Sequence, residues 1–417
     1  MKGANKVYLS LVVGSMTFIG TTSNVFAANQ KFIDQVKTEY TTYESKTSQE
    51  YENYQQSTTK EFEQYQKDEL NSFGLFANQT KQDTQRLDQE LSKDLDSLKK
   101  RYSGNSSYDT RLRDYENKIN PNYLGSPTQQ YVNCTNPNYL NSFMMQYKNA
   151  VNQNYLDSPM MKYKNAVNEN YLNSPMMQYK NAVNENYLNS PMSKLKNGSN
   201  ENYLNSIMNQ YSRGKLAQQE AGNQWRALFQ KENQAIQTIK NQSTASIQQI
   251  KNASEDAILK QKYETVNGIL QQRAQTLETI NELRTEYFGE GFSFEALIPD
   301  LGKINVIINE EWLGFKQPPT LMNGTTLVPM RAIFEKLGAD VKWNQATQSI
   351  AASKGAVNIS LTINHNKATI NGKSITLSAA PRLINGNTMV PLRFVSESLG
   401  ADVKWDGQNK TVFIQSK

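Results

Sequence analysis

The residue types that catalytic sites use most often are scarce in this sequence. The 417 residues include one cysteine, Cys134, and one histidine, His365. A nucleophile with its base, or a metal ion held by imidazoles, needs several such groups together. No nucleophile elbow, phosphate loop or zinc motif is present. His365 stands in the polar stretch INHNKATI, which is typical of a solvated loop. We therefore expect no catalytic residue, no metal site and no cofactor.

Carboxylates are numerous, with 39 Asp and Glu in the chain. They fall mostly on the polar faces of two helical segments, where charged side chains usually form a solvated surface. A carboxylate pair that hydrolyses cell-wall glycans is therefore the weakest of the functional alternatives.

Aromatic residues offer a different chemistry, which is binding. The chain holds 22 Tyr and 4 Trp, and many tyrosines recur every sixteen residues. Such rings have an apolar face and a polar tip, which suits contact with sugars or with a protein. The candidate ligand-contacting residues are Tyr139, Tyr155, Tyr171, Tyr187, Trp343 and Trp405. The alternative is that these rings only pack, the tyrosines between repeats and the tryptophans within strands.

The sixteen-residue block, for example YLNSPMMQYKNAVNEN at 171–186, occurs six times within residues 119–212. Ser158-Pro159 predicts a helix start, because serine caps free amides and proline fits the first helical position. One aromatic column is Tyr123, Tyr139, Tyr155, Tyr171, Tyr187 and Tyr203, and a second is Tyr131, Tyr147, Tyr163, Tyr179 and Tyr211, with Leu195 in the fifth copy. We expect short stacked helices, fused where Phe143 and Ile207 replace the proline.

Long helices are predicted on both sides of the repeats, at 28–118 and 213–289. Large residues there recur every eleven positions, as in the columns Tyr40, Tyr51, Phe62, Phe73 and Trp225, Ile236, Ile247, Ile258, Ile269, Ile280. Eleven residues in three turns keep a stripe on one face. A narrow stripe must pair to be buried. We expect an antiparallel hairpin within the chain, with pairing between two chains as the alternative.

The N-terminus has the pattern of a secretory signal peptide over residues 1–27. Lys2 and Lys6 precede a short apolar core, and Val25-Phe26-Ala27 supplies a cleavage site. The core is too short to span a membrane, and no later stretch is long enough. The net charge of +6 comes without a dense basic block, which disfavours nucleic acid as a partner.

Cys134 lies in the repeats, at the small position that Ala150, Ala166 and Ala182 fill in other copies. Packing is the simpler interpretation of this thiol. A lone cysteine in an exported protein could also link two chains, so a homodimer through Cys134 or through the helices remains an alternative.

After a linker at 290–303 the pattern changes to short alternating strands with an internal duplication. LMNGTTLVPMRAIFEKLGADVKW (321–343) returns as LINGNTMVPLRFVSESLGADVKW (383–405). Each copy has an Asn-Gly hairpin turn, a proline that opens a short helix, and a glycine, Gly338 or Gly400, that closes it.

At these residues the chain resembles the copper amine oxidase N-terminal-like domain, often called the stalk domain, of bacterial surface proteins. The signature V-P-x-R…L-G-A-D-V-K-W occurs twice, and the likeness covers 304–417. It implies an α+β fold of antiparallel strands wrapped on a helix, and export to the envelope of a Gram-positive-type bacterium. It implies no copper chemistry, because this region is a non-catalytic appendage of the oxidases. The oxidases' Asn-Tyr-Asp/Glu-Tyr cofactor motif is absent here.

We therefore predict a multidomain protein: a long α-helical hairpin or coiled coil with short-helix repeats, followed by a duplicated α+β domain with antiparallel sheets. We predict a non-catalytic, secreted, cell-wall-associated structural or binding protein. Its expected partners are cell-wall polysaccharide or another envelope protein. A secreted effector or adhesin that acts on a host surface or membrane is the main alternative.

Overall fold

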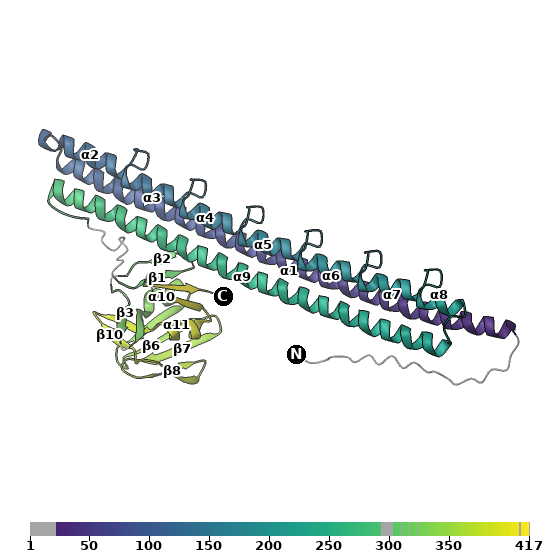
Figure 1. Ribbon diagram of the computed structural model, residues 1–417. Coiled ribbons are helices and arrows are strands. Elements are labelled where there is room, and N and C mark those ends of the chain that lie inside the picture. Colours follow the sequence, from purple (N-terminus) through teal and green to yellow (C-terminus); the bar gives the residue numbers. More distant parts are fainter. Residues whose placement is uncertain are drawn as a thin grey trace. The chain divides into compact units, whose positions relative to one another are not determined.

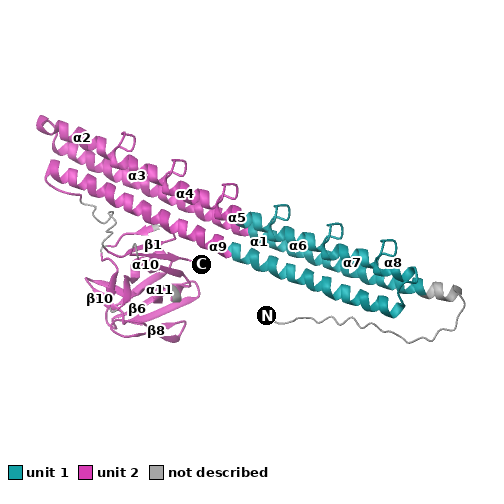
Figure 2. Ribbon diagram, in the orientation of Figure 1, with its two compact units in different colours: residues 1–63, 163–251 teal, residues 64–162, 252–417 magenta. Residues whose placement is uncertain are grey.

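The computed structural model describes residues 22–292, 303–309, 311–315, 317–322, 324–407 and 410–416 (Figure 1). Residues 1–21, which hold most of the predicted signal peptide, lie outside the described residues, as does most of the predicted linker. The chain divides into two compact units (Figure 2). Unit 1 combines the chain up to Glu63 with Tyr163–Lys251, and unit 2 combines Gln64–Lys162 with Asn252–Lys417.

The predicted fold class is confirmed: two long helices, a set of short helices and a C-terminal α+β part. The helices are α1 (Thr22–Arg101), η1 (Ser106–Tyr108), α2 (Asp109–Ile119), α3 (Pro127–Thr135), α4 (Phe143–Ala150), α5 (Pro159–Val167), α6 (Pro175–Val183), α7 (Pro191–Ser199), α8 (Ile207–Ser212) and α9 (Gln218–Phe288). The helix predicted over 28–118 is interrupted after Arg101, where Gly104 takes a φ of +79° and the chain turns into η1 and α2.

The long helices run parallel, so the prediction of antiparallel pairing is wrong. The contacts between them are Tyr43–Asn233, Glu50–Lys240 and Glu61–Lys251 in unit 1, and Ser72–Lys262, Asp83–Arg273 and Asp94–Arg284 in unit 2. The two members of each pair are separated by 190 residues. A constant difference requires helices that run in the same direction, because antiparallel helices keep the sum of the two numbers constant.

The repeats provide the return path between the two long helices. In unit 1, Tyr51 donates to Glu169 (2.6 Å) and Tyr40 donates to Glu185 (2.5 Å). In unit 2, the hydroxyls of Thr265 and Thr276 donate to the carbonyl oxygens of Phe143 (3.0 Å) and Pro127 (3.1 Å). In both units a step of eleven residues on a long helix matches a step of sixteen in the repeats, in the opposite direction.

The long helices have a period of eleven residues and the repeats a period of sixteen, and this difference explains the shape of each repeat. Eleven helical residues advance by about 16.5 Å, and a nine-residue helix such as α6 already advances by about 13.5 Å. Only a small part of the remaining seven residues is needed to reach the next copy. The excess chain is therefore directed away from the long helices, and in each unit it forms a loop between successive short helices (Figure 1).

The inner face of the short helices is an apolar core. In unit 1, Tyr179 and Tyr163 are fully buried and contact Tyr51 and Phe62 edge-on, with ring centroids 5.2 Å apart in each pair. In unit 2, Tyr147 contacts Phe73 at 5.4 Å in the same way. Edge-to-face contacts of this kind add stability beyond the apolar area that is buried.

The short helices do not fuse where the proline is missing, which corrects the prediction at Phe143 and Ile207. α4 begins at Phe143 and α8 at Ile207, each after a serine whose hydroxyl accepts a backbone N–H. The serine cap is therefore sufficient to start these helices without proline.

The described residues of the C-terminal part of unit 2 form three sheets and two short helices. The elements are β1 (Asn305–Ile308), β2 (Glu311–Leu313), β3 (Thr320–Met322), β4 (Thr325–Pro329), α10 (Met330–Lys336), β5 (Asp340–Asn344), β6 (Ser349–Lys354), β7 (Val357–Thr362), β8 (Lys367–Ile370), β9 (Lys373–Thr376), β10 (Arg382–Ile384), β11 (Asn387–Pro391), α11 (Leu392–Leu399), β12 (Asp402–Asp406) and β13 (Thr411–Gln415). The strand orders are β12-β13-β1-β2, β10-β11-β4-β3 and β5-β6-β7-β8-β9.

The two copies of the duplication form one domain with a shared core. Val328 of β4 pairs with Val390 of β11 in antiparallel fashion, so equivalent residues of the two copies face each other. The ring centroids of Phe334 and Phe394, from α10 and α11, lie 6.4 Å apart in the same core. Strand β1 pairs with β13 in parallel, an exception to the predicted antiparallel sheets. The N-terminal strand thereby completes the sheet of the second copy.

The predicted turns of this domain are present where they are described. Asn371-Gly372 and Asn385-Gly386 take positive φ at both residues, as a type I′ hairpin turn requires. Asn323 of the equivalent first turn lies outside the described residues. Gly338 and Gly400 follow α10 and α11 with φ of +82° and +69°, in the left-handed region that closes helices.

Candidate functional site

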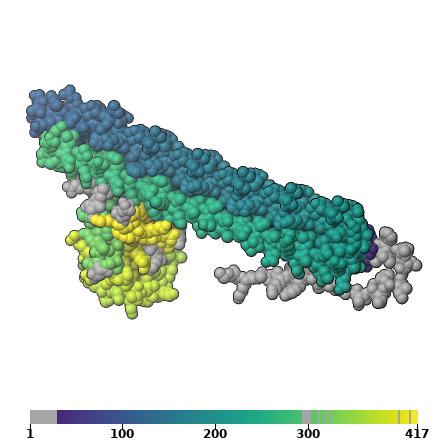
Figure 3. Space-filling model, viewed as in Figure 1, coloured from purple at the N-terminus to yellow at the C-terminus, as the bar shows by residue number. Residues whose placement is uncertain are grey.

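A distinctive surface of the described residues is a set of six similar exposed turns, which we call the Tyr–Leu turns. They are residues 120–126, 136–142 and 152–158 in unit 2, and 168–174, 184–190 and 200–206 in unit 1. In every turn the leucine is 67–87% exposed and the preceding tyrosine is 47–50% exposed. The space-filling view shows the repeat region, in blue to teal, as a knobbed surface (Figure 3).

Each Tyr–Leu turn has the same set of backbone hydrogen bonds. In turn 168–174 the N–H of Asn170 donates to Asn168 Oδ1 (2.9 Å), and the N–H of Tyr171 donates to the Asn168 carbonyl (3.2 Å). The N–H of Ser174 donates to the Tyr171 carbonyl (3.0 Å), and its hydroxyl donates to the Asn168 carbonyl (2.6 Å). Asn173, just before the serine, has a φ of +60°. Asparagine tolerates this left-handed conformation better than most residues.

The serine at the end of each turn also begins the next helix. Ser174 Oγ accepts the N–H of Met177 (2.9 Å), and Gln178 Nε2 donates to the carbonyl of Asn173 (3.2 Å). Much of the turn's polar backbone is thus satisfied internally. Burial of such a turn against a partner leaves few polar groups without hydrogen bonds, so its desolvation costs little.

Little net charge remains around the turns. In unit 1, Glu169 and Glu185 pair with Lys180 and Lys196, both at 2.9 Å. The hydrogen bond from Tyr51, with the help of Lys180, holds the pKa of Glu169 below its usual range. In unit 2 the equivalent positions are Pro121, Pro137 and Gln153, which carry no charge. Two charges lie at these unit 2 turns: Asp157, which is exposed in turn 152–158, and Lys148, which donates to Asn138 Oδ1 (2.8 Å).

The structure separates the two aromatic columns that the sequence contains. The column with Tyr147, Tyr163 and Tyr179 is buried, so packing explains it. The candidates Tyr139 and Tyr155 in unit 2, and Tyr171 and Tyr187 in unit 1, stand on the turns and are about half-exposed. Their role in ligand contact stays a prediction.

The two candidate tryptophans are on different sheets and are not brought together. Trp405 on β12 is 49% exposed, whereas Trp343 on β5 packs partly against the domain core. The indole N–H of Trp343 donates to Gln345 Oε1 (2.8 Å). The core-packing alternative therefore describes Trp343 better than Trp405.

The structure describes both of the scarce reactive residues, Cys134 and His365. The Cys134 thiol donates to the Tyr131 carbonyl (3.0 Å), and burial raises the pKa of this thiol to about 12. His365 is exposed in the turn after β7. Within the described parts of the chain, no cluster of three or more His, Cys, Asp or Glu could hold a metal ion. No helix among the same residues is long and apolar enough to cross a membrane.

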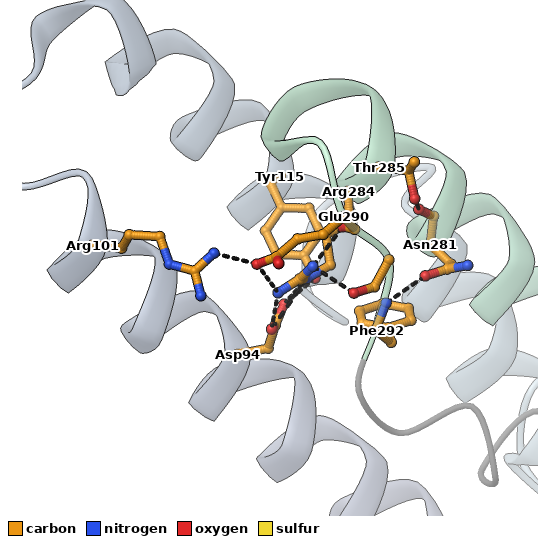
Figure 4. Close-up of polar contacts among 9 residues, drawn as sticks. Asp94, Arg101, Tyr115, Asn281, Arg284, Thr285, Glu290 and Phe292 are labelled. Carbon is orange, nitrogen blue, oxygen red and sulfur yellow. Dashed lines mark hydrogen bonds and ion pairs between the residues drawn. The ribbon is translucent and has the colours of Figure 1, made fainter.

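A buried charge with a structural role lies at the end of α9 in unit 2 (Figure 4). Arg284 is 6% exposed and binds Asp94 of α1 through Nε and Nη2, each at 2.9 Å. Its Nη1 donates to the carbonyls of Glu290 (2.5 Å) and Gly291 (2.7 Å). Tyr115 of α2 donates to the same Asp94 carboxylate (2.7 Å). This cluster joins α1, α2 and α9.

The comparison with known families concerns the C-terminal domain. Residues 307–414 match the copper amine oxidase N-terminal domain. The predicted resemblance at 304–417 is thereby confirmed, and the match is to the non-catalytic part of those oxidases. The copper amine oxidase N-terminal domain accounts for about a quarter of this chain. A relative described as a protease inhibitor, from Brevibacillus choshinensis, is 43% identical over 79 residues, which are 19% of this chain and 24% of that protein. The match thus spans about a quarter of that relative's length.

The leucines of the turns were missed by sequence reasoning. Leu140, Leu156, Leu172 and Leu188 are more exposed than the tyrosines beside them. A signal was available, because each leucine precedes an Asn or Asp and then a Ser, which favours a left-handed residue before a helix cap. An apolar residue in such a tight turn projects outward.

Proposed function

We propose that this chain is a non-catalytic, exported structural and binding protein of a bacterial cell envelope. In this proposal the copper amine oxidase N-terminal domain holds the protein at the wall, and the Tyr–Leu turns form a multivalent contact surface. The observation that carries the proposal is the repetition of the same exposed turn three times in each unit.

Repetition favours binding over catalysis for a physical reason. A catalytic site needs one arrangement of reactive groups, whereas identical weak contacts gain strength by acting together. Tyrosine, asparagine and serine, which make up most of each turn, also predominate in antibody loops that bind proteins. Each turn is held by its own hydrogen bonds, so little conformational entropy is lost when it binds.

Retention at the wall is assigned to the C-terminal domain. Trp405 is its most exposed aromatic ring among the described residues, and exposed rings of this kind bind the faces of sugars. Wall polysaccharide is therefore the proposed ligand of this domain.

Co-sedimentation with purified Gram-positive cell walls tests the proposal. We expect the purified chain to pellet with the walls, and Trp405→Ala to reduce the bound fraction several-fold. The matched control is Trp343→Phe, because Trp343 contacts the core and phenylalanine keeps an apolar ring there. A wild-type chain that stays in the supernatant with walls and shows no affinity for an envelope extract would overturn the proposal.

A second candidate function follows from the likeness to the Brevibacillus protein, which is described as a protease inhibitor. In this second proposal the chain inhibits secreted proteases. A panel of serine, cysteine and metalloproteases, assayed with and without the chain, decides this candidate. Inhibition at stoichiometric concentrations would favour it over retention at the wall.

A further inference from the structure

The Tyr–Leu turns point to one partner in particular. We infer that they bind the turns of a second copy of this chain, so that two repeat surfaces interlock. This inference rests on the proposed function only in that the turns are a binding surface, and it names what they bind.

The period of the turns is the first argument. Successive turns within a unit are one repeat apart. One repeat matches eleven residues of the long helices, which corresponds to about 16.5 Å. A multivalent contact forms only if the partner offers sites at the same spacing. A second copy has this spacing by construction. A symmetric pair of equal surfaces is also the commonest arrangement among oligomers.

The charge of the turns is the second argument. Two equal surfaces repel each other if they carry a net charge, because like charges then meet across the interface. Glu169 and Glu185 are neutralised by Lys180 and Lys196, and the unit 2 turns have Pro or Gln at the equivalent positions. Glu201 in the last turn pairs with Lys37 of α1 (2.8 Å). Five of the six turns therefore offer a nearly neutral apolar surface to an equivalent one, and turn 152–158 carries the exposed carboxylate of Asp157.

The same neutrality argues against other partners. Anionic wall polymers and anionic bilayers attract surfaces with an excess of Lys or Arg, which the turns lack. A glycan stacks on the face of an aromatic ring, yet in each turn the leucine is the more exposed of the two side chains. A largely exposed leucine gains most from contact with other apolar side chains.

The surface between turns can receive a turn from another copy. Two residues after Pro159 and Pro175, the short helices carry Met161 in unit 2 and Met177 in unit 1, and Met145 stands at the same place in α4; all three are partly exposed. The equivalent residues of the other repeats are Gln129, Ser193 and Asn209. Methionine adapts its shape to an incoming apolar side chain. A leucine from one copy would pack on this methionine, between two turns of its partner.

Sedimentation equilibrium of the purified chain tests the inference. We expect a reversible dimer at micromolar concentrations, and at least about tenfold weaker association for the triple variant Leu172→Ser, Leu188→Ser, Leu204→Ser, since each leucine loses apolar burial. The matched control is Leu75→Ser, Leu321→Ser, Leu383→Ser, which removes three exposed leucines outside the turns. The control should dimerise like the wild type. Circular dichroism of both variants should match the wild type, because all six side chains are exposed.

A crosslink gives a second readout that does not depend on affinity. In a Cys134→Ala background, Leu188→Cys should yield a covalent dimer with a short bismaleimide, whereas Leu75→Cys should not. A monomeric wild type at all concentrations overturns the inference, as does a dimer that the turn variant leaves unchanged. Binding of the turns to neutral or anionic vesicles or to wall glycan, without self-association, also overturns it. Wall retention is measured separately, so its loss would contradict the proposed function and not this inference.

Discussion

Gly268 of α9 lies directly against the ring of Phe143, the first residue of α4. A Cβ at Gly268 would come within 2.5 Å of Phe143 Cε1 and 2.6 Å of its Cδ1 and Cζ. Phe143 stands where Pro159, Pro175 and Pro191 stand in other repeats. The glycine and the phenylalanine thus fit each other, and both depart from the pattern of their own segments.

Gly268→Ala should therefore destabilise the protein, although alanine is the better helix former. The clash with the partly buried Phe143 ring costs roughly 1–3 kcal/mol, which outweighs a gain in helix propensity of about 1 kcal/mol. In a Phe143→Ala background, Gly268→Ala should instead stabilise the protein, because the ring that causes the clash is gone. Urea unfolding of the two single variants and the double variant measures this coupling.

Gly74→Ala is the matched control for that cycle. Gly74 is also inside a long helix, α1, but nothing lies within 4 Å of a Cβ placed there. This variant should stabilise the chain by up to about 1 kcal/mol. Equal effects of the two glycine variants would contradict the fit between Gly268 and Phe143.

The eleven- and sixteen-residue periods could be read from the sequence, but the direction of the helices could not. A stripe such as Ile236, Ile247 and Ile258 is equally compatible with a parallel or an antiparallel neighbour. The deciding fact is that the repeats of unit 1 run in reverse along its part of α1. That follows only from contacts such as Tyr51–Glu169 and Tyr40–Glu185, which join distant parts of the chain.

The exposure of the turns could not be predicted from the sequence, for a related reason. Tyr171 and Tyr179 are eight residues apart in the same repeat, and composition does not distinguish their surroundings. Tyr179 is fully buried and Tyr171 is 49% exposed, because sixteen residues must cover the advance of eleven and the excess chain is directed outward.

In the C-terminal domain, turns and helix ends were predictable from Asn385-Gly386 and Gly400, whereas the pairing of Val328 with Val390 was not.

The stability of unit 1 should fall in acid through Glu169 and Glu185. Hydrogen bonds from Tyr51 and Tyr40, together with Lys180 and Lys196, lower the pKa of each carboxyl in the folded protein. A lowered folded pKa means stability that is complete above the ordinary carboxyl range of about 4.3. This stability is lost as the pH falls through the lower folded pKa.

The double variant Glu169→Gln, Glu185→Gln should therefore be less stable than the wild type at pH 7, and the difference should shrink at pH 3. Urea unfolding at the two pH values measures the difference in the free energy of unfolding between the variant and the wild type at each pH. Glu63→Gln, an exposed side chain of α1, is the control and should show no such dependence. If this difference in stability is the same at pH 3 and pH 7, the two carboxylates are not its cause.

Loss of Asp94 should be far more damaging than loss of a surface charge. Asp94→Asn leaves the buried Arg284 with the half-exposed Glu290, 3.8 Å away, in place of the Asp94 carboxylate at 2.9 Å, and breaking a buried pair in this way costs roughly 3–5 kcal/mol. Lys93→Ala, which removes the exposed pair with Glu90 on the next turn, should cost less than about 1 kcal/mol. Thermal unfolding followed by circular dichroism compares the two. Similar effects would mean that Arg284 is solvated when Asp94 is absent.

The parallel course of α1 and α9 can be tested by crosslinking within unit 1. Glu50 and Lys240 contact each other at 3.3 Å, so cysteines at these two positions should be joined rapidly by a short bismaleimide in a Cys134→Ala background. The control pair, Glu50→Cys with Lys251→Cys, is displaced by eleven residues, or about 16.5 Å along α9, and should not react. Proteolysis and mass spectrometry distinguish a link within one chain from a link between two. A chain that crosslinks only between copies, or reacts equally well in the displaced pair, would show that the constant separation of 190 residues does not hold in solution.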